Sequence, residues 1–149
     1  MSATMLCRER DSLNAAAIPP SSLNGTYNTG GIDMSVFERG QFFISWGDAT
    51  GSTINAALYQ GNSADGSGKV AVTNGLSSSY NTLNGTMTME LRSDQMFARY
   101  LFCQVVVATV ALLTSVTPVG TVARFRPANS FDNSKVATRF AGYPGGPQY

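Results

Sequence analysis

Short segments in which apolar and polar residues alternate run through the middle of the chain. The clearest are residues 53–60 and 86–92, whose apolar positions are Ile54, Ala56 and Leu58 in the first and Met87, Met89 and Leu91 in the second. Alternation with a period of two is typical of a strand that buries one face. Because no segment shows a convincing amphipathic helix longer than two turns, the chain is predicted to be all-β.

Further strands are expected at residues 41–46, 69–73, 97–113 and 121–125, and a short helical turn or strand edge at residues 33–37. The segment 97–113 is long enough for one extended strand or two. Its Val-rich part favours strand over helix. The stretch 101–119 is interrupted by polar residues and falls short of the roughly 20 apolar residues that a membrane-spanning helix needs. We therefore expect no membrane association.

Asn-Gly pairs occur three times, at residues 24–25, 74–75 and 84–85. Asn-Gly readily adopts the positive φ angles of tight hairpin turns, so each pair is expected to close a turn between strands. About seven short strands separated by polar turns predict a single β-sandwich or jelly-roll-like domain.

The chain has 149 residues, which suits one domain of ordinary size. Residues 27–127 are expected to form the sandwich. Residues 1–26 are expected to form an N-terminal arm, because a weak helical pattern at 14–18 is ended by Pro19 and Pro20 and a turn follows. Residues 128–149 are expected to form an extended C-terminal arm.

The C-terminal arm is unusual because it combines Gly and Pro with aromatic residues, which are scarce in solvated linkers. Arginine nearby suits interfaces, since its planar guanidinium pairs with carboxylates in a bidentate way. We therefore expect this arm to order against a partner. The expected partner-binding residues are Arg126, Phe131, Arg139, Phe140, Tyr143 and Tyr149.

The chain contains no histidine and two cysteines, Cys7 and Cys103. A Ser–His–Asp triad, a Cys–His pair and the usual mixed zinc site all require histidine. The nine carboxylates are scattered without a spacing that marks an acid–base pair. We therefore expect no enzymatic activity, no catalytic or metal-binding residues and no cofactor. Cys103 lies in an apolar run and is expected to be a buried, reduced thiol.

Ten basic and nine acidic residues give a net charge of +1, and charged residues make up 13% of the chain. Nucleic-acid-binding domains normally carry a clear basic excess, so no nucleic-acid partner is expected. A neutral polar surface is suited to extensive protein contact. A second hypothesis is a carbohydrate-binding β-sandwich in which Trp46 or Tyr59 stacks on a sugar; the alternative is that Trp46 belongs to the core.

A longer pattern of apolar positions and turn residues runs through residues 29–39 (TGGIDMSVFER), 42–45, 52–60 (STINAALYQ) and 65–68, and more loosely through 97–100 and 123–127. Over roughly residues 29–127 it resembles small virion proteins of tailed bacteriophages, of the capsid decoration or cement type. The apolar stretch 105–116 and both arms depart from that pattern.

This resemblance implies a structural virion protein that docks on a shell of major capsid protein and stabilises it. It further implies a homo-oligomer on the capsid lattice, located in the virion capsid and assembled in the host cytoplasm. Arms that reach neighbouring subunits would add binding through multivalency. A head–tail or tail-tube component is the alternative role within a virion.

Overall fold

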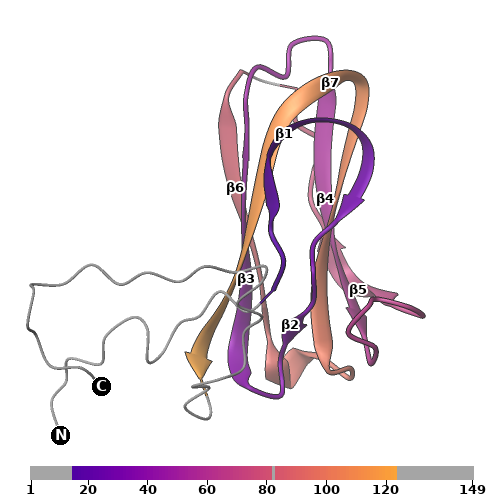
Figure 1. Ribbon diagram of the computed structural model, residues 1–149, viewed down its shortest axis with the longest axis vertical. Helices are drawn as coiled ribbons and strands as arrows, with labels where there is room; N and C mark the ends of the chain where they lie inside the picture. Colours follow the sequence, from indigo (N-terminus) through magenta and orange to yellow (C-terminus); the bar gives the residue numbers. More distant parts are fainter. Residues whose placement is uncertain (1–14, 82, 124–149) are drawn as a thin grey trace, which may run out of the picture.

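The computed structural model describes residues 15–81 and 83–123 (Figure 1). Within this part every strand pairing is antiparallel. The elements are β1 (Ile18–Asn28), β2 (Ile32–Asp33), β3 (Phe37–Trp46), β4 (Thr53–Gly61), β5 (Val70–Leu76), β6 (Gly85–Arg92), a 3₁₀ helix η1 (Ser93–Gln95) and β7 (Tyr100–Ala123).

Two strands bend sharply, and this makes the sheet fold over into two layers. The first half of β7 pairs with β4 and its second half pairs with β3. β1 follows the same bend, because residues 18–23 pair with the second half of β7 and residues 25–28 pair with the first half. Figure 1 shows the bend of β1 lying inside the larger arch of β7.

When the halves of the bent strands are counted separately, the layers have a simple order. One layer runs β5, β4, β7 (residues 100–108) and β1 (residues 25–28), with β2 beside the start of β7. The other runs β6, β3, β7 (residues 112–123) and β1 (residues 18–23). Two four-stranded layers in which the chain alternates between layers are the jelly-roll arrangement. The predicted all-β, jelly-roll-like sandwich is confirmed.

The core lies between the two layers and follows the alternation seen in the sequence. Ile54, Ala56 and Leu58 of β4 are buried, as predicted. Met87, Met89 and Leu91 of β6 are only partly buried, because β6 is an edge strand. The largest completely buried side chains include Phe37, Phe42, Ile32, Ile44, Ile54, Leu101, Leu112, Val105, Val107 and Val116.

The β3–β4 connection is fastened to the bend of β7. The buried Ser52 hydroxyl oxygen lies 2.7 Å from the carbonyl oxygens of both Ala108 and Val110. A hydroxyl has one proton and donates it to one of these acceptors at a time. Thr109, between the two acceptors, has a positive φ of 85°. The contact therefore holds the connection against the most sharply turned part of β7.

The prediction that the Asn-Gly pairs close hairpins is wrong. Gly25 has a φ of 125° but lies in the bend of β1, and Asn74 has a φ of 59° but lies inside β5 at an irregularity in its pairing with β4. Gly85 begins β6, where it packs against the ring of Trp46. In this topology most consecutive strands cross between layers, so most turns join strands that are not hydrogen-bonded to each other.

The expected N-terminal boundary also needs correction, because residues 18–26 belong to β1 and to the sandwich rather than to an arm. Pro19 and Pro20 do not end an element; they lie at a register shift on an edge strand, where proline is tolerated. The segments 97–113 and 121–125 belong largely to one strand, β7. Residues 1–14 and 124–149, which include the expected C-terminal arm, lie outside the described residues.

Candidate interaction surface

The six expected partner-binding residues all lie outside the described residues. They are Arg126, Phe131, Arg139, Phe140, Tyr143 and Tyr149. Their role in binding a partner therefore stays a prediction. Cys7 lies outside the described residues as well.

Trp46 belongs to the core, and the proposal that it stacks on a sugar is wrong. Its side chain is 6% exposed and its ring centroid lies 5.5 Å from that of Tyr80. Tyr59 is half-buried in β4, and the ammonium group of Lys69 lies 5.5 Å from its ring centroid. A cation already occupies one approach to that ring.

Charged residues are distributed very unevenly between the two ends of the sandwich. We name one end the bend end and define it by residues 24–25, 47–52, 77–81, 83–84 and 108–113. Its described residues include one charged side chain, Asp48. The opposite end, the loop end, is defined by residues 29–36, 62–69 and 93–99. It carries Asp33, Asp65, Lys69, Asp94 and Arg99.

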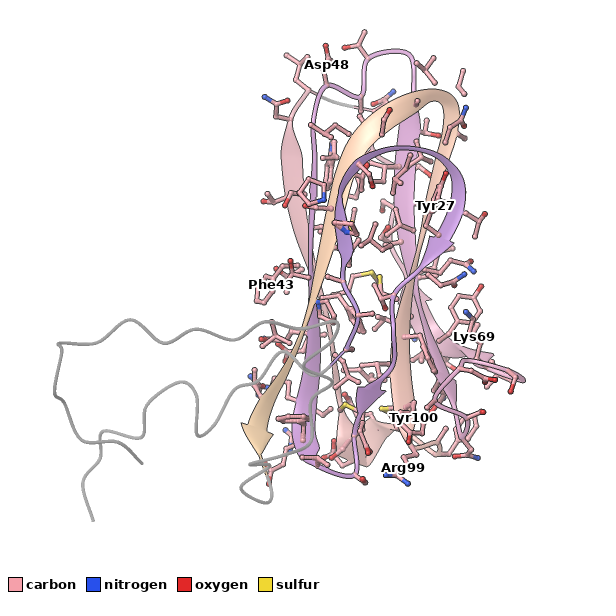
Figure 2. The ribbon with its side chains drawn as sticks, in the orientation of Figure 1. Tyr27, Phe43, Asp48, Lys69, Arg99 and Tyr100 are labelled. Carbon is pink, nitrogen blue, oxygen red and sulfur yellow. The ribbon has the colours of Figure 1, made fainter. Side chains whose placement is uncertain are left out.

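In Figure 2, Asp48 lies at the bend end and Arg99 at the loop end. Several apolar side chains are exposed at the bend end, although the most exposed one of the described residues, Phe97, lies at the loop end. Val110 and Leu113 in the bend of β7 are 53% and 58% exposed, and Leu83 before β6 is 64% exposed. Tyr80 adds a partly exposed ring. Exposed apolar residues gathered at one place mark a surface for interaction more often than single scattered ones do.

A shallow pocket lies next to Leu113, where the end of β3 pairs with β7. Its volume is about 270 Å³, which is below the roughly 300–1,000 Å³ that is usual for small-molecule sites. It suits a single inserted side chain better than a whole ligand. It is lined by Pro20, Ser45, Trp46, Gly47, Asn84, Leu113, Thr114 and Ser115.

Asp48, the charged residue of the bend end, is held in its ionised form. Hydrogen bonds from the side chain and backbone N–H of Thr50 keep the pKa of Asp48 below its ordinary value, and the backbone bond measures 2.9 Å. Among its described residues, the bend end therefore carries one negative charge at neutral pH.

The loop end uses its charges internally. The Arg99 guanidinium donates to both carboxylate oxygens of Asp33, at 3.1 and 2.7 Å. Partial burial acts to raise the pKa of Asp33, but hydrogen bonds from Arg99 and Ser35 outweigh it and lower that pKa. Asp94 of the loop end pairs with Arg92 at the end of β6, and Arg39 of β3 pairs with Glu90 of β6 close by. These paired groups have less to offer a partner than the bend end does.

Cys103 is a buried free thiol, as predicted. Burial raises its pKa to about 12, so the thiol stays protonated and weakly nucleophilic near neutral pH. Among the described residues there is no group of three or more His, Cys, Asp or Glu side chains that could hold a metal ion. That same part of the chain contains no helix long and apolar enough to cross a membrane.

The sequence leaves open whether residues 101–119 belong to the core or to an interface. In the structure this segment is partly buried and partly exposed. Val105, Val107 and Leu112 are buried in the core, whereas Val110 and Leu113 are exposed at the bend end. Strand alternation alone does not identify the exposed pair, because their exposure depends on where β7 bends.

No protein-family model and no curated protein matches this sequence. Among solved structures, the chain is similar to one titled "Structure of infectious bursal disease virus Gx strain", at a TM-score of 0.43 and 10% sequence identity. The match covers 82% of this chain and 34% of the other, so this chain spans about a third of the length of that one. The strand order by itself defines the class of this protein as a jelly-roll β-sandwich.

Proposed function

We propose that this chain is a structural virion protein that binds the capsid shell of a tailed phage and stabilises it, as decoration or cement proteins do. The observation that carries the proposal is the bend end, where Val110, Leu113 and Leu83 are exposed, Leu113 lines a shallow pocket, and the described residues carry one charge. This arrangement suits a protein surface, because apolar burial drives association and few charges must be desolvated.

Two further features support a binding role rather than chemistry. The chain lacks histidine, and its described thiol is buried and protonated. The sequence pattern over residues 29–127 resembles phage decoration proteins. On a repeating shell, contacts that form only with the assembled lattice would stabilise it by linkage, since the protein binds the intact shell and not its dissociated subunits.

Replacing Leu113 with aspartate should weaken shell binding roughly tenfold or more, because a charge would be placed at the centre of the apolar contact. Purified protein is mixed with shells of the encoding phage that lack it, and co-sedimentation gives the affinity. Phe97→Asp is the matched control, since Phe97 is also strongly exposed but lies at the loop end. Equal affinities for the two variants would contradict docking through the bend end.

The proposal includes the C-terminal residues as a second contact. Deleting residues 128–149 should lower shell affinity by about tenfold or more, as expected when one of two linked contacts is lost. The circular dichroism spectrum and thermal midpoint should stay close to those of the full chain, because the described core ends at residue 123. Unchanged affinity for the shell would show that this segment is not a contact.

A further inference from the structure

The four edges of the two layers are not equally protected. The edge formed by residues 18–23 of β1 contains Pro19 and Pro20 and a register shift. The edge formed by residues 25–28 of β1 is short and is separated from β2 by three residues. The β5 edge contains a register shift near Asn74. Prolines, bulges and short strands are the devices that prevent an edge from pairing with another chain.

β6 lacks these devices. All eight of its residues pair with β3 in continuous register, from Gly85 with Trp46 to Arg92 with Arg39. No described strand pairs with its other side. Such a strand presents a row of unpaired backbone N–H and C=O groups. Its first five residues, 85–89, are uncharged.

The side chains of β6 also indicate incomplete coverage. Met87, Met89 and Leu91 point toward the core but remain partly exposed. A strand added beside β6 would cover these three side chains and pair the free backbone groups at the same time. Both gains favour strand addition at this edge.

We propose that a second copy of this chain pairs with β6 through its own β6, in an antiparallel and two-fold symmetric contact. Two registers pair nearly the whole length of both strands. The two-fold axis passes at Thr88 in the first register and at Met89 in the second. In the first, Thr88 faces its copy and Glu90 faces Thr86; in the second, Glu90 faces Thr88. Neither register opposes two like charges across the contact, and directly opposed like charges would destabilise a sheet. The strand is thus complementary to itself, as an isologous contact requires.

This contact uses the β6 edge, which β3 separates from Val110 and Leu113 of β7. The β6 contact is tested in the purified protein without shells. A negative result for dimerisation can therefore be distinguished from a negative result for shell binding. In Figure 1 β6 lies at the edge of the layer that it forms with β3. Pairing of two β6 strands would make this layer continuous from one copy into the next.

The test is the self-association of the purified full chain and three variants by sedimentation equilibrium. Wild type should form dimers. Thr88→Glu should weaken dimerisation at least tenfold, because in either register the new carboxylate faces another one. Thr88→Gln should dimerise like wild type, because glutamine has nearly the same shape as glutamate but carries no charge. Thr117→Glu is the matched control, since Thr88 and Thr117 are both exposed and flank Phe43 from opposite sides.

Added salt should partly restore dimerisation of Thr88→Glu by screening the opposed carboxylates. Hydrogen exchange of wild type gives a readout that needs no variant: amides of β6 should become more protected as protein concentration rises. A wild type that remains monomeric overturns the proposal. A Thr88→Glu variant that associates as wild type does, or β6 protection that is independent of concentration, also overturns it.

Discussion

Replacing Phe42 with alanine should lower the free energy of unfolding by about 3–5 kcal/mol, the usual cost of deleting a large buried aromatic side chain. Phe42 is completely buried between the layers. Its neighbour Phe43 points to the opposite side of β3 and is 43% exposed. The matched variant Phe43→Ala should therefore cost about 1 kcal/mol or less.

Urea or thermal unfolding of both variants checks this prediction. The result depends on the register of β3, because a slip by one residue would exchange the environments of the two phenylalanines. If Phe43→Ala were the more damaging substitution, the placement of β3 in the sandwich would be wrong.

Replacing Gly85 with alanine should destabilise the protein by about 3 kcal/mol or more, at or above the upper end of overpacking costs. A Cβ at this position would overlap Cζ2 of Trp46 and lie 2.5 Å from its Cε2. The indole is buried and cannot move away without disturbing the core. The matched control is Gly47→Ala, whose Cβ would meet Leu113 at an ordinary 3.7 Å and should change stability by less than about 0.5 kcal/mol.

A double-mutant cycle assigns this effect to the indole. In a Trp46→Leu background, Gly85→Ala should cost less than it does in wild type, because the smaller side chain leaves room for the Cβ. Thermal unfolding of the four proteins gives the coupling energy. Equal costs in the two backgrounds would mean that the clash with Trp46 is not the cause.

The fold class could be predicted from the sequence because the alternating apolar residues are the ones that the strands bury. Ile54, Ala56 and Leu58 lie on the buried face that their spacing predicts, and the Val-rich run is a strand. The positions of the turns could not be predicted from the Asn-Gly pairs, because such a pair favours positive φ angles but does not determine whether two strands are joined there. That preference is used at Gly25 to bend one strand rather than to join two.

The candidate surface was harder to predict. Val110 and Leu113 come from one segment and Leu83 from another, and the bends of β1 and β7 bring these segments to one end. The absence of charge at that end is visible only after the connections are assigned to ends. The edge at β6, with which no other described strand pairs on its outer side, depends in the same way on which strands are neighbours, since its sequence alone resembles any half-buried strand.

The measurement that tests the central claim most directly is a cryo-electron microscopy map of particles of the encoding phage, compared with particles that lack this protein. The account predicts additional density on the capsid shell that fits the sandwich, with the bend end and Leu113 against the shell. Density at the tail, attachment through the loop end, or no density on the particle would contradict it.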